Sequence, residues 1–214
     1  GAGYNSWYTD YGLHNGDLAR MYTTTGSVGT DQGGYSEAIY GTNGNDTLSG
    51  GGGFKDHIFA YGGDDTLIGS DITEDQFYGG SGNDTMTGLS GNDRFRGDGG
   101  DDTMHGGDGN DMLRYDRSTE GVTVDLSNQG VGQFISLSQG TDTFTSIEWV
   151  RASNYDDVIM GDGAANRIEG RSGNDEIHGG GGDDNLRGEN GNDVIYGGAG
   201  NNWASGYEQA EAVR

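Results

Sequence analysis

Aspartate returns at nearly constant intervals along most of this 214-residue chain. In the stretch GGSGNDTMT (79–87), Asp84 follows an asparagine and stands two places before the single large apolar residue, Met86. The next three blocks of nine, GLSGNDRFR, GDGGDDTMH and GGDGNDMLR, repeat this arrangement. Carboxylates that recur at a fixed period in a glycine-rich backbone could act together as oxygen ligands for a cation.

The sixth positions of these nine-residue units form two series. The first follows a degenerate unit with Glu37 and contains Asp46, Asp56, Asp65, Asp75, Asp84, Asp93, Asp102 and Asp111. The second contains Asp157, Asn166, Asp175, Asp184, Asp193 and Asn202. Single extra residues at Gly50 and Gly69 interrupt the count, and the register recovers after each.

The composition makes a conventional hydrophobic core implausible. Glycine accounts for 46 residues, proline and cysteine are absent, and Leu, Ile, Val and Phe together number 33. With a formal charge of −24, such a chain usually fails to fold unaided. It is therefore either a disordered acidic linker or a fold stabilised by something outside the chain. The charge excludes nucleic acid and anionic membranes as natural ligands, and no apolar run is long enough to span a membrane.

One repeat unit predicts its own local structure. Glycines at its first, second and fourth places allow a tight turn, and its last three residues form a short strand with one inward side chain. Two units then make one coil of an all-β solenoid, with units n and n+2 stacked on the same edge. The inward residues form a thin core: Ile39, Leu48, Ile58, Leu67, Phe77, Met86, Phe95, Met104 and Leu113, then Ile159, Ile168, Ile177, Leu186, Ile195 and Ala204. A disordered linker has no reason to keep these residues in register.

Stacking places Asp84 between Asp65 and Asp102. A column of carboxylates at the strand spacing of about 4.8 Å repels itself unless cations lie between its members. Oxygen ligands, free backbone carbonyls and the absence of cysteine and histidine from the turns favour Ca²⁺.

At this point the chain resembles the RTX (haemolysin-type) calcium-binding repeat family, whose nonapeptide is G-G-x-G-x-D-x-U-x. GGSGNDTMT, GGDGNDMLR and GGGGDDNLR (179–187) match it at every defined place. The resemblance implies a right-handed parallel β-roll with several Ca²⁺ ions between stacked turns. It also implies a secreted protein, exported through Gram-negative type I secretion.

The resemblance implies ligand sets of carboxylates and backbone carbonyls. One site would take Asp84 with the carbonyls of Gly80 and Gly82, and Asp102 with those of Gly97 and Gly99. The next would take Asp93 with the carbonyls of Leu89 and Gly91, and Asp111 with those of Gly106 and Asp108. The equivalent aspartate pairs are Asp46–Asp65, Asp65–Asp84, Asp75–Asp93, Asp56–Asp75, Asp157–Asp175 and Asp175–Asp193. Asp184 would be a further carboxylate ligand, and the further carbonyl ligands would be those of Gly44, Gly63, Gly173, Gly188 and Asn190.

Some units depart from the family pattern. GGGFKDHIF (51–59) has Phe54 where glycine is expected, and SDITEDQFY (70–78) has no glycine. We expect altered sites there, and weaker or empty sites at Glu37, Asn166 and Asn202.

The repeats divide the chain into five segments. Residues 1–31 form an aromatic-rich N-terminal cap, 32–114 the first repeat block, 152–205 the second, and 206–214 a tail. Residues 115–151 lose the nonapeptide but keep short alternating strands, so we expect a divergent connector that continues the solenoid in wider coils without calcium. A separate inserted domain is the alternative.

The expected function is a secreted calcium-binding module without catalysis, because no nucleophile and base are arranged as in a known mechanism. Its partners would be calcium ions and a cell-surface polysaccharide or a larger parent protein. The alternatives are an adhesin or carbohydrate-binding module, a non-catalytic part of an extracellular polysaccharide-modifying or hydrolytic enzyme, or an enzyme with an unrecognised site in 1–31 or 115–151.

Overall fold

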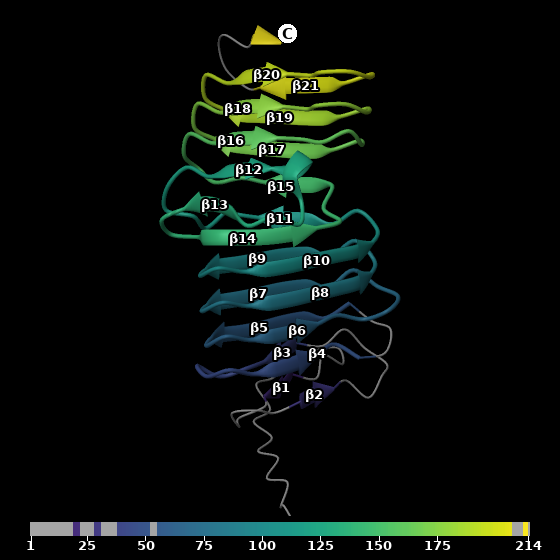
Figure 1. Cartoon of the computed structure of the whole chain (residues 1–214), viewed down its shortest axis with the longest axis vertical. Coiled ribbons are helices and arrows are strands. Elements are labelled where there is room, and N and C mark those ends of the chain that lie inside the picture. The colour runs from purple at the N-terminus through teal and green to yellow at the C-terminus, as the bar shows by residue number, and fades with distance from the viewer. Residues whose placement is uncertain (1–18, 22–27, 31–37, 52–54, 207–211, 214) are drawn as a thin grey trace, which may run out of the picture.

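The computed structural model describes residues 19–21, 28–30, 38–51, 55–206 and 212–213, which form a solenoid of stacked strands (Figure 1). Three sheets run along its axis. The ten-stranded sheet contains β1 (Ala19–Met21), β3 (Ala38–Tyr40), β5 (His57–Gly62), β7 (Gln76–Ser81), β9 (Arg94–Gly99), β11 (Met112–Arg114), β15 (Trp149–Arg151), β17 (Arg167–Ser172), β19 (Asn185–Asn190) and β21 (Trp203–Gly206), in that order.

The opposite wall of the solenoid consists of two shorter sheets. The seven-stranded sheet has the order β13 (Gln133–Ser136), β14 (Gly140–Thr145), β10 (Thr103–Asp108), β8 (Thr85–Ser90), β6 (Thr66–Ile68), β4 (Thr47–Ser49) and β2 (Val28–Thr30). The five-stranded sheet has the order β12 (Thr123–Asp125), β16 (Val158–Met160), β18 (Glu176–His178), β20 (Val194–Tyr196) and β22 (Ala212–Val213). The all-β parallel roll expected from the repeats is confirmed.

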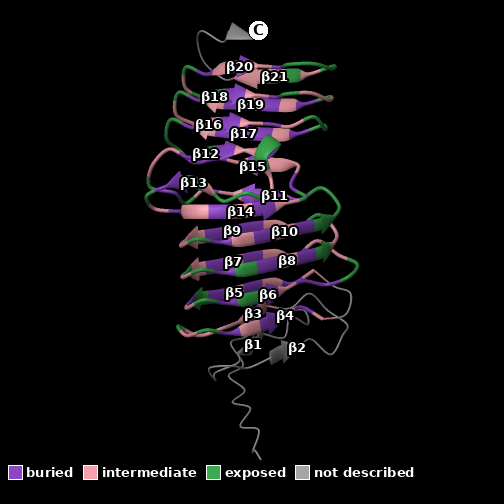
Figure 2. Ribbon diagram, viewed as in Figure 1, coloured by how far each residue is buried: buried purple, intermediate pink, exposed green. Residues whose placement is uncertain are grey.

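The core is a set of apolar ladders in exact register. Leu48 pairs with Leu67, Leu67 with Met86, and Met86 with Met104 on one wall. Every predicted inward residue from Ile39 to Ile195 is buried, and Ala204 packs against the same cluster. Figure 2 shows the buried residues as bands inside the stack. The period of nine therefore determined both the strand pairing and the burial.

Several strands are longer than the three residues predicted. Strands β5, β7, β8, β9, β10, β17 and β19 have six residues each, because the strand continues past the bend at the first residue of the next unit, which is Ala60 in β5 and glycine in the others. Tyr61 pairs with Gly80 there, and Gly62 with Ser81. The turns between the walls are thus stacked as closely as the strands.

The connector interrupts one wall and leaves the other continuous. In the ten-stranded sheet, β15 pairs with β11 on one side and with β17 on the other. On the opposite wall, β14 closes the seven-stranded sheet against β10, while β12 begins the five-stranded sheet beside β16. A short 3-10 helix (Leu126–Asn128) follows β12, and β13 pairs antiparallel with β14. Within this segment the chain therefore advances along the solenoid axis to β12, returns to β14 beside β10, and then advances again through β15.

The ends of the described chain also carry strands. Most of the predicted aromatic cap lies outside the described residues, but β1 and β2 already pair with β3 and β4. In the predicted tail, β22 pairs with β20. In this described part, no helix has the length and apolar character needed to cross a bilayer.

Candidate metal centre

The aspartates at the sixth position are buried in the turns between the two walls. Each stands immediately before a strand, and its side chain turns inward rather than toward solvent. Asp46 has 4% of its surface exposed, and Asp56, Asp75, Asp93 and Asp111 have 0%. The other members are almost as deeply buried: Asp65, Asp84, Asp102, Asp157, Asp175, Asp184 and Asp193. Burying this many carboxylates is costly unless each is compensated.

One oxygen of each carboxylate is compensated by the turn one coil earlier. The backbone N–H of Asp65 donates to Oδ1 of Asp84 at 2.9 Å, and the N–H of Asp84 donates to Oδ1 of Asp102 at 2.9 Å. The same bond recurs at the other edge of the coil, where the N–H of Asp93 donates to Oδ1 of Asp111 at 2.7 Å. The remaining steps are Asp46–Asp65, Asp56–Asp75, Asp75–Asp93, Asp157–Asp175 and Asp175–Asp193. The columns predicted from the period are thus hydrogen-bonded ladders.

The second carboxylate oxygen is left without a partner in many of these residues. Among the described residues, Oδ2 is buried and accepts no hydrogen bond in Asp65, Asp84, Asp93, Asp102, Asp111, Asp175 and Asp184. A buried charged acceptor without a donor costs several kcal/mol. Seven such atoms in regular columns are acceptors that a cation could compensate.

Backbone carbonyls converge on the same spaces. A Cβ added to Gly79 would overlap both Oδ2 of Asp84 and the carbonyl oxygen of Gly97. Gly88 stands in the same relation to Asp93 and Gly106. The pattern repeats at Gly170 with Asp175 and Gly188, and at Gly179 with Asp184 and Gly197. Each cradle therefore pairs an unpartnered carboxylate oxygen with a carbonyl oxygen from the next coil, which is the all-oxygen chemistry that Ca²⁺ prefers.

The other carbonyls predicted as ligands have different surroundings. Those of Gly99, Asp108 and Asn190 accept the N–H groups of Gly82, Gly91 and Gly173, at 3.0, 2.9 and 3.0 Å. The carbonyls of Gly63, Gly82, Gly91 and Gly173 face the glycine of the next coil so closely that a Cβ there would overlap them. Leu89 faces Gly107 in this way, Gly80 lies against the carbonyl of Tyr61, and the Gly44 carbonyl accepts a weak bond from Thr42 Oγ1.

Where a hydroxyl residue replaces glycine at the start of a turn, the protein itself supplies the missing donors. Thr42 gives its N–H at 2.6 Å and its hydroxyl at 2.8 Å to Oδ2 of Asp46. Ser70 bonds to Oδ2 of Asp75 in the same way, at 2.7 and 3.0 Å. The N–H of Ser153 donates to Oδ2 of Asp157, while its hydroxyl donates to Oδ1. Hydroxyl-bearing turns are therefore self-satisfied, and glycine turns are not.

At two positions of the columns an asparagine replaces the aspartate, and its amide group forms hydrogen bonds within the protein. Asn202 accepts the N–H of Asp184 with its amide oxygen and donates its Nδ2 to the carbonyl of Gly197 at 2.8 Å. Asn166 accepts the N–H of Asp162 with Oδ1. At Asn202 an amide donor therefore stands beside the Gly197 carbonyl, where an aspartate would present a second carboxylate oxygen.

The connector contributes two column members that the nonapeptide search missed. The N–H of Asp102 donates to Oδ1 of Asp142 at 3.1 Å, and the N–H of Asp111 donates to Oε2 of Glu148 at 2.9 Å. Both precede an inward apolar residue by two places, Phe144 and Val150, which is the signal that could have found them. The unit of Asp142 keeps only its fourth-position glycine, Gly140, and the unit of Glu148 has none, so neither follows the nonapeptide.

The column through Asp102 ends at a tyrosine. The hydroxyl of Tyr115, a fully buried residue, donates to Oδ2 of Asp142 at 2.9 Å. Beside Asp111, in contrast, a Cβ on Gly106 would overlap both Asp111 Oδ2 and the carbonyl of Ser146, so that cradle keeps its usual form.

Replacing Tyr115 with phenylalanine is expected to lower the free energy of unfolding by about 1–3 kcal/mol, because Asp142 Oδ2 is then buried without a donor. Thermal unfolding in saturating Ca²⁺ measures it. Tyr78→Phe is the matched control, since the Tyr78 hydroxyl bonds to Gln76 Oε1 on the partly exposed outer face and its loss should cost little. Equal effects of the two substitutions would contradict the assigned role of Tyr115.

Burial raises the pKa values of the column aspartates, because it disfavours the charged carboxylate. The pKa rises to about 6 for Asp84, to about 7 for Asp93 and Asp175, and to about 8 for Asp102. Hydrogen bonds from backbone N–H groups oppose this rise, and neighbouring carboxylates add to it at Asp102 through Asp142 and Asp84. Each of these carboxyl groups therefore holds its proton more tightly than an exposed aspartate does.

No three acidic or histidine side chains converge on one point within the described ranges. Each cradle is instead shared between successive coils and relies on backbone oxygens. The residues present therefore fit Ca²⁺ by donor type, burial and unmet charge.

Comparison with known protein families gives an independent result. The model of the RTX calcium-binding nonapeptide repeat matches residues 31–53, 40–71, 78–113, 142–177, 151–186 and 170–204, which together cover more than half of the chain. The search of curated proteins found no match to the chain. The matched ranges contain both aspartate series except Asp75, and they reach into the connector as far as Asp142 and Glu148. The chain belongs to the family of RTX calcium-binding nonapeptide-repeat proteins.

Proposed function

We propose that this protein is an extracellular module whose folding is driven by calcium. The single observation that carries the proposal is the set of seven buried Oδ2 atoms without a partner. They lie in a chain of charge −24 that has only a thin apolar core. Without cations, the fold must hold columns of carboxylates in a low dielectric, which strongly favours the unfolded chain.

The proposed ions occupy the cradles that begin with glycine. These are the spaces beside Asp84, Asp93, Asp102, Asp111, Asp175 and Asp184, with the neighbouring carbonyls of the next coil. One further ion would lie beside Asp65, whose turn begins with Ala60 instead of glycine. The turns that begin with Thr42, Ser70 and Ser153 are satisfied by protein donors and need no ion. Calcium would supply positive charge between the carboxylates and so join one coil to the next.

Metal affinity then determines where the chain folds. Extracellular calcium modules bind with dissociation constants of roughly 10⁻⁴–10⁻³ M, so their sites stay empty at cytosolic calcium levels. The chain would cross the cell envelope unfolded, by a type I secretion route, and fold outside as its sites fill. Its role is structural, as a folding and stabilising unit beside a partner domain.

A calcium titration followed by far-UV circular dichroism tests the proposal. The metal-free chain is expected to give the spectrum of a largely unfolded protein and to gain β signal cooperatively near millimolar Ca²⁺, with full reversal by a chelator. Mg²⁺ at the same concentration should have little effect, because it demands a tighter octahedral site. A chain that shows the same β spectrum with and without Ca²⁺ would overturn the proposal.

A further inference from the structure

Among the described side chains, positive charge gathers on one face of this acidic protein. Nine Lys and Arg side chains lie in the described part, and seven of them belong to strands of the ten-stranded sheet: Arg94, Arg96, Arg114, Arg151, Arg167, Arg171 and Arg187. The other two, Lys55 and Arg117, lie beside β5 and β11. The strands of the two other sheets contain no Lys or Arg.

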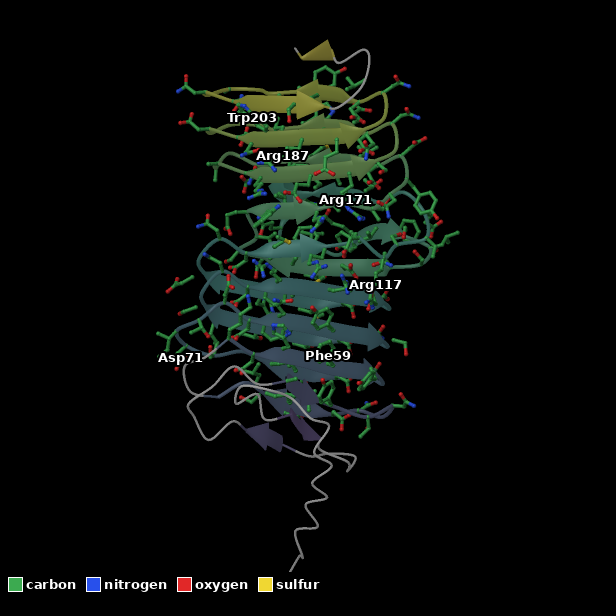
Figure 3. All side chains as sticks on the ribbon, turned by 180° about the vertical axis from the view of Figure 1, so that it is seen from behind. Phe59, Asp71, Arg117, Arg171, Arg187 and Trp203 are labelled. Carbon is green, nitrogen blue, oxygen red and sulfur yellow. The ribbon has the colours of Figure 1, made fainter. Side chains whose placement is uncertain are left out.

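All of these arginines except Arg171 stand next to a core residue in their strand, and side chains alternate between the two faces of a sheet, so they lie on its outer side. In β9, for example, Phe95 is buried inward between Arg94 and Arg96. Figure 3 shows Phe59, Arg117, Arg171, Arg187 and Trp203 at successive heights of the stack on this side. The five strands from β9 to β19 are neighbours, so the arginines extend over roughly 20 Å at about 4.8 Å per strand.

Internal ion pairs leave much of this charge unmatched. Glu169 is shared by Arg151, Arg167 and Arg187, at 3.7, 2.6 and 4.0 Å. Asp116 is shared by Arg96 and Arg114, at 2.7 and 2.9 Å. The strands of this sheet carry seven arginines among the described side chains against three carboxylates, Asp98, Glu169 and Glu189. Beside the strands, Asp116 and Glu74 add two carboxylates, and Lys55 and Arg117 add two cations, so the described side chains of this face are net positive.

The same face is hollowed and lined with aromatic rings. One recess of about 550 Å³ is bounded by Phe59, Tyr61, Tyr78, Arg96, Arg114 and Asp116. A second, of about 360 Å³, shares Arg114 and includes Trp149 and Glu189. Tyr61 and Trp203 are about half exposed, at 53% and 52%. Arg167 lies over the Trp149 ring at 3.9 Å, so cationic and aromatic groups are interleaved along the surface.

We propose that the outer face of the ten-stranded sheet binds an extended acidic polysaccharide. Arginine forks match carboxylate and sulfate groups, aromatic rings offer flat apolar surfaces to sugar rings, and Asp98 and Asp116 can accept hydrogen bonds from hydroxyl groups. The recesses follow one another along the solenoid axis, which suits a linear polymer.

Two other anionic partners fit this face less well. Nucleic acid, with a phosphate at every residue, is repelled by the overall charge of −24 and by carboxylates placed among the arginines. The core of a protein–protein interface is depleted in charged residues, whereas charges lie at the centre of this face. The proposal does not depend on the role of calcium, beyond the need for a folded chain.

The test uses the whole chain in millimolar Ca²⁺ and three probes: a hyaluronate oligosaccharide, a chondroitin sulfate oligosaccharide and neutral dextran. We expect both acidic sugars to bind, with affinity that falls as salt is added, and dextran not to bind. The variant Arg94→Gln/Arg151→Gln/Arg187→Gln should weaken binding roughly tenfold, because each partly exposed charge contributes only a few-fold.

The matched control is Thr66→Glu/Thr85→Glu/Thr123→Glu, which lowers the net charge by the same three units on the other two sheets. It should bind nearly as tightly as the parent chain. Circular dichroism verifies that both variants fold. If the triple arginine variant does not fold, Arg117→Gln, a substitution in an exposed turn, replaces it in the binding measurement. Absence of binding to both acidic sugars, equal losses in the two triple variants, or tighter binding of a single-stranded DNA oligonucleotide would overturn the proposal.

Discussion

Replacing Asp84 with alanine is expected to remove or weaken two adjacent calcium sites. Asp84 Oδ2 lines the cradle beside Gly79, and its Oδ1 accepts the N–H of Asp65. Its own N–H donates to Asp102, so the substitution lies in the middle of a ladder. The loss of a buried hydrogen bond costs about 1–3 kcal/mol, and the lost ion adds to this. We expect the midpoint of the calcium titration to rise about tenfold and calorimetric stoichiometry to fall by one or two ions.

The neighbouring substitution Thr85→Ala is its control. Thr85 begins β8 and faces outward, so its loss should change neither stoichiometry nor midpoint appreciably. The variant Asp84→Asn distinguishes the effect of the lost charge from that of the lost side chain. The amide keeps an oxygen for the Asp65 N–H but brings no negative charge to an ion. If Asp84→Ala bound as many ions as the parent chain, the columns would not be the calcium sites.

Protons are expected to compete strongly with calcium in this protein. Burial holds the pKa of Asp93 at about 7 and that of Asp102 at about 8, far above the usual value of about 4. Below these values each carboxylate must lose a proton before it can bind a cation, which costs about a factor of ten per pH unit. The calcium midpoint should therefore rise at least about a hundredfold between pH 8 and pH 5.5, as measured by dichroism at each pH.

The metal-free chain should respond in the opposite direction. A carboxyl group whose pKa is higher in the folded state binds protons more tightly there than when unfolded, and so favours folding in acid. This stabilisation is complete below the unfolded pKa of about 4 and is lost as pH rises through the folded values of about 6 to 8. In chelator, the β signal should be larger at pH 4.5 than at pH 8. A metal-free chain that gained structure with rising pH would contradict this account.

One carboxylate of the outer face follows the reverse rule. Burial alone would raise the pKa of Asp116, but hydrogen bonds from Arg96 and Arg114 outweigh it and hold the pKa at about 2. Its contribution to stability is present above pH 4 and is lost only as pH falls through about 2. It therefore does not obscure the change expected between pH 4.5 and pH 8.

The amino-acid sequence by itself determined the repeating part of this protein. A period of nine with one inward residue, as at Met86 and Leu67, leaves a single stacking register, because a shift by one residue would expose the whole ladder. The same period placed Asp84 over Asp65 and under Asp102, and glycine at the turns allowed the close stacking. These features are local and repeat identically, so they can be read without coordinates.

Only the tertiary structure showed what compensates each carboxylate, since this depends on atoms from different coils. Thr42 and Ser70 satisfy their aspartates locally, but Tyr115 reaches Asp142 across 27 residues, and no spacing rule connects them. The reversal between β12 and β14 brings them together, and that path follows from how the connector packs. The gathering of arginines on the ten-stranded sheet likewise emerged only when alternate half-coils were assigned to opposite walls, because charge that is scattered along the chain becomes contiguous in space.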